Sequence, residues 1–218
     1  MTRRIVVLDG HTLNPGDNPW EPVAQHGELE VYDTTPDDQI VERASSADIV
    51  LTNKTPLAGE TLEKLDSLEF ISILATGFDV VDIDWAARHD IPVSNVPEYG
   101  TESVAQHTLA LLLEMSNHVA RHDEAVRDGD WQEAGEFSFW VESVVELSER
   151  TLGIVGLGKI GRRVAEIGRA LGMRVVANSR SEQRPPPWHD FEWLERDELL
   201  ETADVVTLHS FQGGDRWI

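Results

Sequence analysis

The stretch TLGIVGLGKIGRRVAEIGRALGMRVVANSR, from Thr151 to Arg180, limits the possible folds of this chain more than any other part of it. The apolar run TLGIVG predicts a buried strand, and KIGRRVAEIGRALG has the apolar spacing of an amphipathic helix. MRVVANS then predicts a second strand. A strand, a glycine-rich turn, a helix and a second strand form a β-α-β unit, whose two strands are parallel.

Three glycines in the first turn of this unit predict a site for the pyrophosphate of a dinucleotide. Gly156 permits the tight turn, Gly158 lacks the Cβ that would block the pyrophosphate, and Gly161 lets the helix approach the strand. The backbone N–H groups of Lys159 and Ile160 would then open the helix toward the anion. Since a strand and a helix flank the glycines, the pattern indicates more than a flexible turn.

The end of the second strand discriminates between the two nicotinamide dinucleotides. NAD sites usually carry an acidic residue there, which accepts from the ribose 2′-OH, whereas a 2′-phosphate requires a basic residue. This chain has Asn178, Ser179 and Arg180 at that point, and Arg184 follows closely. We therefore expect NADP(H) to be favoured over NAD(H), the alternative being that Arg180 is an ordinary solvated residue.

The rest of the chain predicts a second α/β layer before this unit. RIVVLDG, ELEVYD, ADIVLTN, FISILATG and IPVSNV predict five short strands, with helices such as TPDDQIVERAS, capped by Thr35 or Asp37, between them. One long helix is expected from about Glu102, apolar on more than one face. Beyond it we expect three strands. The fold class is α/β, with a flavodoxin-like substrate domain at residues 1–101 and an incomplete doubly wound Rossmann domain at residues 102–218.

Composition excludes several classes of function. The formal net charge is −22 with only three lysines, so there is no basic stripe for nucleic acid. Such an acidic surface suits a halophilic, salt-rich cytosol, or is simply that of an acidic soluble protein. Absence of cysteine excludes disulfides and thiolate sites. The N-terminus MTRRIVVLDG has too short an apolar run for a secretory leader or a membrane span, so we expect a cytoplasmic protein without membrane partners.

Several motifs together resemble one family. GLGKIG, LSERTLGIVG, LDGHTLNPGD and LATGFDVVDIDWAARHDIPVSNVPEYGTESVAQHTLALLLE resemble the D-isomer-specific 2-hydroxyacid dehydrogenases, in their glycerate dehydrogenase or hydroxypyruvate reductase branch. TNK at residues 52–54, SVAQ at 103–106 and FSFW at 137–140 are similar to that branch as well. The resemblance extends over about residues 5–209, which is nearly the whole chain.

The resemblance implies both an activity and a set of binding residues. The activity is hydride transfer between a nicotinamide and a small anionic 2-oxo or 2-hydroxy acid such as hydroxypyruvate or glyoxylate. The residues implied to bind the substrate are Asn53, Lys54, Thr76, Gly77 and Phe78, the last three through backbone N–H groups. Thr76, Thr108 and His209 are implied to lie near the cofactor. The family's homodimers further imply that the long helix and the segment around Trp131 form a dimer interface.

The resemblance does not supply catalytic residues within these 218 residues. The arginine, glutamate and histidine of the family lie in its C-terminal third, and this sequence departs from the family pattern after His209, where it reads SFQGGDRWI. His209 matches a family position near the cofactor rather than the acid/base histidine. His118 and His122 have metal-ligand spacing but no third partner, so a solvated or interfacial pair is the favoured interpretation and no metal is expected. We expect an inactive or incomplete, C-terminally truncated dehydrogenase, or alternatively a non-catalytic dinucleotide-binding remnant or regulatory protein.

Overall fold

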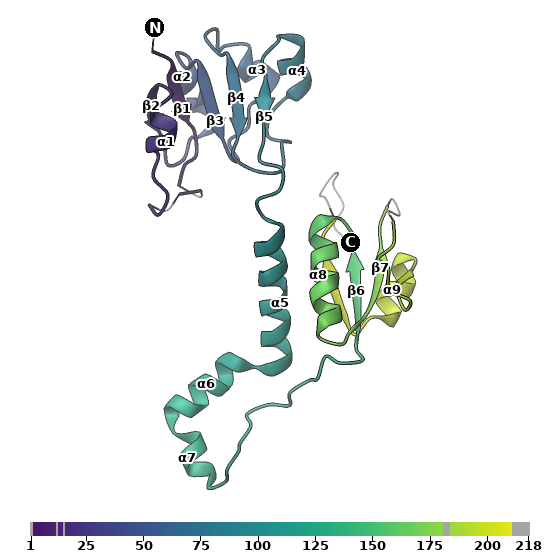
Figure 1. Cartoon of the computed structure of the whole chain (residues 1–218). Coiled ribbons are helices and arrows are strands. Elements are labelled where there is room, and N and C mark those ends of the chain that lie inside the picture. Colours follow the sequence, from purple (N-terminus) through teal and green to yellow (C-terminus); the bar gives the residue numbers. More distant parts are fainter. Residues whose placement is uncertain (1, 12, 15, 181–183, 211–218) are drawn as a thin grey trace. The chain divides into compact units, whose positions relative to one another are not determined.

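The computed structural model describes residues 2–11, 13–14, 16–180 and 184–210. The chain divides into two units, residues 1–99 and residues 100–218. Each contains a parallel sheet with helices on its faces, as expected for an α/β protein (Figure 1). Among the described residues, no helix has the length and apolar character required to cross a membrane.

The first unit has a five-stranded sheet in the order β2-β1-β3-β4-β5. This is the flavodoxin-like order, which confirms the predicted class of this unit. All four strand pairs are parallel, with Val7 opposite Val31 in one pair and Leu51 in the next. The strands are β1 (Arg4–Val7), β2 (Glu28–Val31), β3 (Ile49–Thr52), β4 (Phe70–Ile73) and β5 (Val93–Ser94), and the helices are α1 (Glu21–Ala24), η1 (Asp37–Gln39), α2 (Ile40–Ala44), α3 (Gly59–Leu62) and α4 (Ile83–Arg88).

The two faces of this sheet carry separate apolar cores, because alternate residues of a strand point to opposite faces. Val6 and Leu8 pack with residues of α2, α3 and α4, among them Ile40 and Leu62. Ile5 and Val7 point to the other face, where the half-buried Trp20 and Val23 at α1 cover them. Burial on both faces explains why these strands are continuous apolar runs rather than alternating ones.

Helix capping in this unit differs in one place from the sequence expectation. Asp82 caps α4 by accepting the backbone N–H of Trp85 at 2.8 Å. By contrast, neither Thr35 nor Asp37 caps the helix that follows them: Pro36 occupies the N-cap position. The hydroxyl of Thr35 instead donates to the carbonyl of Leu8 at 2.6 Å, so it connects the loop to β1.

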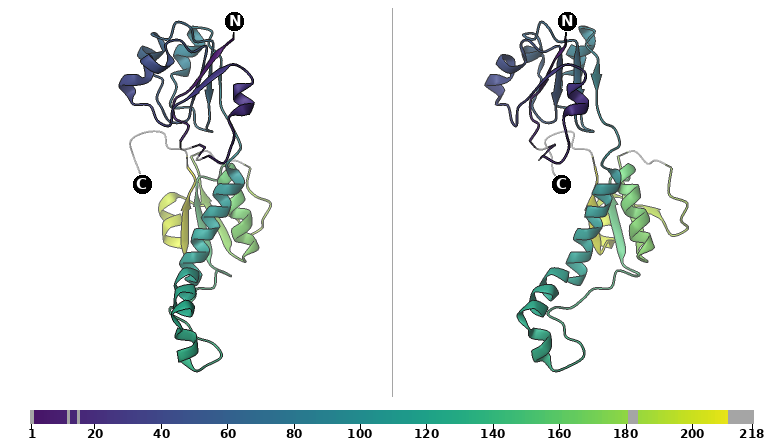
Figure 2. Two further views of the ribbon diagram at one scale, coloured as in Figure 1. Left: turned by 90° about the vertical axis from the view of Figure 1, so that its left-hand side faces the viewer. Right: turned by 60° about the vertical axis from the view of Figure 1, so that its left-hand side comes forward.

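The second unit has a four-stranded parallel sheet in the order β8-β7-β6-β9. The expectation of three strands was wrong, because the sheet contains a fourth strand, β8. This strand is short and pairs with β7 through only two residues, Glu192 and Trp193. Helices α8 and α9 lie on opposite faces of this sheet (Figures 1 and 2), and α5 packs along α8. The elements are β6 (Thr151–Val155), α8 (Lys159–Ala170), β7 (Arg174–Asn178), β8 (Glu192–Trp193), α9 (Arg196–Thr202) and β9 (Val205–Leu208).

The single long helix expected from about Glu102 is three helices in the structure. They are α5 (Thr101–Asn117), α6 (Val119–Asp128) and α7 (Asp130–Ala134). His118 ends α5 in the left-handed conformation, with φ 51° and ψ 43°, and Gly129 separates α6 from α7 with φ 97°. A residue in that conformation cannot continue an α-helix, so the chain changes direction at each point.

Candidate functional site

The glycine turn after β6 has the geometry that the fingerprint predicts. Gly156 has φ +97°, which is unfavourable for any residue with a side chain. A Cβ on Gly156 would also lie 2.6 Å from the carbonyl carbon of His209 and from the nitrogen of Ser210. The turn therefore needs glycine for two reasons: its backbone conformation and the close approach of the segment that follows β9.

The other two glycines serve different purposes. A Cβ on Gly161 would lie 2.3 Å from the carbonyl oxygen of Gly156, so this glycine allows α8 to pack directly against the turn. At Gly158, no atom of a described residue lies within 4 Å of the position of a Cβ. Since the protein itself does not require glycine there, the open space is what a phosphate group approaching the backbone would need.

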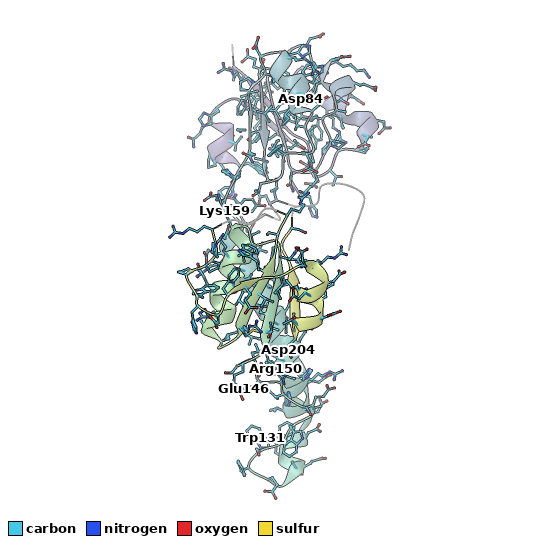
Figure 3. All side chains as sticks on the ribbon, turned by 90° about the vertical axis from the view of Figure 1, so that its right-hand side faces the viewer. Asp84, Trp131, Glu146, Arg150, Lys159 and Asp204 are labelled. Atoms are coloured by element: carbon cyan, nitrogen blue, oxygen red, sulfur yellow. The ribbon has the colours of Figure 1, made fainter. Side chains whose placement is uncertain are left out.

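The start of α8 provides donors for an anion. Gly158 is its N-cap residue and offers no side-chain cap. Lys159, Ile160 and Gly161 form the first turn, where backbone N–H groups have no acceptor within the helix. Lys159 lies at the end of this unit opposite Asp204 (Figure 3), which is the carboxyl edge of the sheet. The glycine turn and the helix start thus fit a dinucleotide pyrophosphate.

A groove of about 830 Å³ begins where β7 ends. Ser179 fixes the turn beside it, because its hydroxyl oxygen accepts the backbone N–H of Leu157 at 2.9 Å. Arg180 is exposed and makes no ion pair with any described residue. The residues that line the groove are Asn178, Ser179, Arg180, Trp193, Leu194, Glu195, Arg196 and Asp197. The last five were not predicted from the sequence, since Trp193 belongs to the short unpredicted strand β8 and the other four follow it.

His209 lies where β9 ends, next to the glycine turn. Its backbone N–H donates to the carbonyl of Val155 at 2.8 Å, and its Nε2 lies 2.9 Å from the hydroxyl of Thr207. Partial burial lowers the pKa of the His209 imidazole, because loss of solvation disfavours the charged ring. This position beside the turn is consistent with the sequence prediction, whereas its role toward a cofactor stays a prediction.

Thr108 and Thr76, the other residues predicted near a cofactor, lie in different units. Thr108 lies on α5 and donates its hydroxyl to the carbonyl of Val104 at 2.8 Å. Thr76 follows β4 in the first unit, and its hydroxyl donates to the carbonyl of Val96 at 2.9 Å. Both hydroxyls therefore have a backbone acceptor within their own unit, and their predicted roles remain untested.

In the first unit, the predicted substrate residues follow two neighbouring strands, β3 and β4. Because the strands are parallel, with Thr52 opposite Ile73, both loops leave the carboxyl edge of the sheet side by side. A backbone hydrogen bond of 2.7 Å from Leu57 to Val80 joins them further along. The structure thus brings the loop of Asn53 and Lys54 next to the loop of residues 76–78.

These two loops differ in the state of their backbone N–H groups. The N–H groups of Asn53 and Thr55 each donate to the carboxylate of Asp9 at 2.7 Å, and that of Lys54 donates to it as well. The N–H groups of Thr76, Gly77 and Phe78 donate to no described residue. Donors in the second loop are therefore available to an anion, and those in the first loop are not; that this anion is a substrate carboxylate stays a prediction.

Two exposed side chains, Lys54 and Phe78, lie on these loops. Lys54 is exposed, and its ammonium group makes no ion pair with any residue in the described part of the chain. Phe78 is 48% exposed, although it is a large apolar residue. A cation and an exposed aromatic ring beside available N–H groups suit a small organic anion.

His118 and His122, at the start of α6, contact other groups of the protein. Nδ1 of His122 lies 2.9 Å from the carbonyl of His118, and Nε2 accepts the backbone N–H of Val141 at 3.2 Å. His118 lies 3.8 Å from the carboxylate of Glu142, which also pairs with Arg121. No group of three metal-ligating side chains occurs within residues 2–11, 13–14, 16–180 and 184–210.

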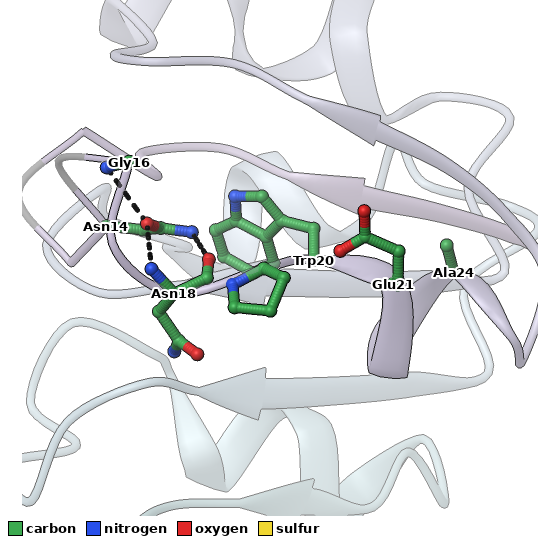
Figure 4. Close-up of a pocket in the computed structure, with 7 residues that line it drawn as sticks. Asn14, Gly16, Asn18, Trp20, Glu21 and Ala24 are labelled. Carbon is green, nitrogen blue, oxygen red and sulfur yellow. Dashed lines mark hydrogen bonds between the residues drawn. The ribbon is translucent and has the colours of Figure 1, made fainter.

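A further hollow of about 560 Å³ lies in the loop before α1, lined by Asn14, Trp20 and Glu21 among others (Figure 4). Its polar groups mostly bind one another: the Asn14 side chain accepts the N–H groups of Gly16 and Asn18, each at 3.1 Å. None of the residues predicted to bind substrate or cofactor lines it. The hollow is therefore separate from both predicted sites.

Comparisons with known proteins agree with this geometry. Residues 5–211 match the family model of the D-isomer specific 2-hydroxyacid dehydrogenase catalytic domain. The chain is 42% identical to a hydroxypyruvate reductase of Blautia hydrogenotrophica, with 94% of the chain and 65% of that protein covered. It is 31% identical to a glycerate dehydrogenase of Methylorubrum extorquens, with 96% of the chain and 64% of that protein covered.

Solved structures give the same result. An acyclic imino acid reductase in complex with NADPH and D-Arg is 27% identical, with a TM-score of 0.75, and 96% of this chain and 66% of that one are covered. A D-lactate dehydrogenase from Aquifex aeolicus complexed with NAD and lactic acid is 26% identical, with a TM-score of 0.73, and 95% of this chain and 60% of that one are covered. The chain thus spans about two thirds of the length of these relatives or less. On its sequence and its fold alike, the chain belongs to the D-isomer specific 2-hydroxyacid dehydrogenases.

Proposed function

We propose that this chain binds NADP(H) through its second unit and a small 2-oxo acid, such as hydroxypyruvate or glyoxylate, through its first. The observation that carries the proposal is the open space at the Gly158 backbone, which no described residue fills, at the start of a helix without a side-chain cap. Relatives named as a hydroxypyruvate reductase, a glycerate dehydrogenase and a glyoxylate reductase support the substrate class. When bound, the nicotinamide would supply or accept a hydride.

The preference for NADP(H) rests on the residues after β7. A 2′-phosphate needs a cation and tolerates no carboxylate at the ribose position. Ser179 is small and already fixed by Leu157, while the guanidinium of Arg180 is exposed beside the groove. Glu195 and Asp197 also line that groove, but Asp197 pairs with Arg196 at 3.2 Å, which offsets its charge.

Competitive titration with the two dinucleotides tests this preference. We expect NADPH to bind at least about tenfold more tightly than NADH, as followed by the quenching of tryptophan fluorescence. Arg180→Ala should remove most of the difference by weakening NADPH alone. Arg174→Ala is a matched control, because Arg174 lies at the opposite end of β7 and does not line the groove. Equal affinities in the unsubstituted chain, or an unchanged ratio in Arg180→Ala, would contradict the assignment.

The roles of the chain's own residues toward a 2-oxo acid follow from the two loops of the first unit. The N–H groups of Thr76, Gly77 and Phe78 would bind the substrate carboxylate, and Lys54 would add a compact positive charge. The amide of Asn53 would contact a polar group of the same substrate. Burial of the substrate carboxylate among these groups orients it, which is a requirement of catalysis rather than catalysis itself.

We further propose that the 218 residues by themselves bind these ligands without turnover. The arginine clamp and the histidine with its glutamate, which the family resemblance implies, have no counterpart at the sites described above, and loss of such groups commonly costs a factor of hundreds or more. The absorbance of NADPH with hydroxypyruvate and with glyoxylate measures this directly. Turnover that His209→Ala abolishes would show that His209 is catalytic. The alternative function, a regulatory protein that binds the dinucleotide without catalysis, would give the same binding and the same lack of turnover.

We also propose that the helices α5 to α7 form a homodimer interface. Met115 on α5 is 73% exposed, and Trp131 on α7 is 46% exposed. Apolar surface of this extent is costly in water and is commonly covered by a second subunit.

A further inference from the structure

The most unusual charged group in the first unit is the carboxylate of Asp9. It follows β1 at the carboxyl edge of the sheet and is only 7% exposed. It makes no ion pair with any described residue. Burial of an unpaired charge costs free energy, so such a group persists only where hydrogen bonds compensate for the lost solvation.

Among the described residues, the donors that compensate for this loss all belong to one turn. Oδ1 of Asp9 accepts the N–H of Asn53, and Oδ2 accepts the N–H groups of Lys54 and Thr55. The hydroxyl of Thr52 closes the same turn by donating to the carbonyl of Thr55 at 2.8 Å. Asp9 and Thr52 thus fix the backbone of three consecutive residues although neither of them is exposed.

This arrangement decides how the turn meets an anion. With its three N–H groups directed inward to Asp9, the turn cannot bind a carboxylate through its backbone. Only its side chains can do so, and Lys54 is the exposed cation among them. The neighbouring loop is the reverse, since the N–H groups of Thr76, Gly77 and Phe78 have no described acceptor.

We propose that Asp9 is the positioning residue of the substrate site: it holds the turn of residues 53–55 so that Lys54 faces the anion bound by the loop of residues 76–78. Asp9 does not touch the substrate and acts through Lys54. The proposal rests on the proposed function of these loops in binding a 2-oxo acid. Asp9 lies in the motif LDGHTLNPGD, for which the sequence predicted no role in substrate binding.

The test is a double-mutant cycle measured by calorimetry on the full chain loaded with NADP⁺, which cannot reduce the ligand. Hydroxypyruvate is the probe, and hydroxyacetone, which lacks the carboxylate, is the ligand control. We expect Lys54→Ala to weaken hydroxypyruvate binding about tenfold, because it removes a charge-assisted contact. Asp9→Asn should weaken it by a similar factor, because an amide presents only one acceptor to the three donors. The double variant should be no weaker than either single variant.

Asp48→Asn is the matched control for loss of structure. Asp48 lies in the same unit and accepts a backbone N–H, that of Arg4 at 2.6 Å, but at the opposite, amino edge of the sheet. We expect Asp48→Asn to change hydroxypyruvate affinity less than twofold, and all variants to keep their affinity for NADPH.

The possible failures are distinguishable. The proposed function of the loops is wrong if the unsubstituted chain does not bind hydroxypyruvate more tightly than hydroxyacetone. It is also wrong if Lys54→Ala leaves the affinity for hydroxypyruvate unchanged. If Lys54→Ala weakens binding but Asp9→Asn does not, or if the two effects multiply, Asp9 has only a structural role. Amide proton shifts of residues 53–55 provide a second measurement: Asp9→Asn should move these three signals and leave those of residues 76–78 in place.

Discussion

The carboxylate of Asp204 accepts the backbone N–H of Thr151 at 2.8 Å, which joins the start of β9 to the start of β6. Asp48 does the same in the first unit, where it accepts the N–H of Arg4 at 2.6 Å between β3 and β1. The two aspartates occur in the similar sequences ADVV and ADIV. Each sheet is therefore closed at its amino edge by the same contact.

Substitution of Asp204 should reduce stability in a way that depends on pH. The hydrogen bond from Thr151, helped by Arg150 beside it (Figure 3), lowers the pKa of Asp204. A carboxyl group with a lowered pKa in the folded state stabilises the protein above its unfolded pKa of about 3.9, and this contribution is lost as the pH falls through the folded pKa. We expect Asp204→Asn to lower the Tm at pH 7 by several degrees. Its Tm should also decrease less than that of the unsubstituted chain as the pH is lowered. Glu201→Gln, an exposed charge change on α9, should leave both unchanged.

The glycines of the dinucleotide turn should separate folding from binding. Gly161→Ala introduces a Cβ 2.3 Å from the carbonyl of Gly156, so we expect a loss of about 1–3 kcal/mol in urea denaturation. Gly158→Ala meets no protein atom, so its stability should stay within about 0.5 kcal/mol of the unsubstituted chain. Only its affinity for NADPH should fall, by about tenfold or more. A Gly158→Ala chain that bound NADPH normally would exclude the turn as the pyrophosphate site.

His209 should make the second unit sensitive to mild acid. Burial lowers the pKa of His209 in the folded state below the value of about 6.5 expected in the unfolded chain. The unfolded state therefore binds more protons in this window, and stability decreases as the pH falls through 6.5 toward the folded pKa. His209→Gln should show a smaller decrease between about pH 8 and pH 5. Because the chain has eight histidines, only the difference between the two denaturation series is informative. Parallel series would contradict the assignment.

The exposed apolar residues of α5 to α7, called the arm below, should determine whether the chain is a dimer or a monomer. Met115→Glu places a charge on the exposed apolar surface, and we expect the dimer to dissociate at a concentration at least about tenfold higher than before. Leu200→Glu is the matched control, since Leu200 is an exposed apolar residue on α9, away from the arm. Light scattering over a range of protein concentrations measures both. A monomeric unsubstituted chain at low and high salt would refute the proposed dimer.

Salt should stabilise the chain. With 40 acidic and 18 basic residues, repulsion among carboxylates exceeds attraction between ion pairs. Raising the ionic strength from about 0.1 M to about 1 M shortens the screening length from about 10 Å to about 3 Å, which weakens this repulsion. We expect the Tm to rise over this range in potassium chloride. A Tm that fell or stayed constant would indicate an ordinary acidic protein.

Strong local patterns predicted most of the fold. The strands of the first unit are short apolar runs bounded by polar residues, and the structure confirms all five of them. Weak or absent signals explain the differences. β8 has two residues and follows a proline-rich link, so its pairing depends on β7 rather than on its own sequence. No glycine or proline marks the end of α5, because His118 itself adopts the left-handed conformation.

The candidate site shows the same division. Glycines at fixed spacing predict the dinucleotide turn, because the backbone conformation of Gly156 and the contact between Gly161 and Gly156 are local. Asp9 is different: its three partners lie in the turn of residues 53–55, which only the pairing of β1 with β3 brings near. A contact of that kind depends on the tertiary fold and leaves no local pattern in the sequence.

The contact between Gly156 and His209 has a consequence for synthesis on the ribosome. The glycine turn emerges well before β9, yet its backbone rests against the residues that follow β9. During synthesis, the turn therefore lacks its packing contact with His209 and Ser210 until β9 has been translated and has paired with β6. Dinucleotide binding should therefore be acquired late, as a checkpoint that only chains with a completed β6–β9 pair can pass.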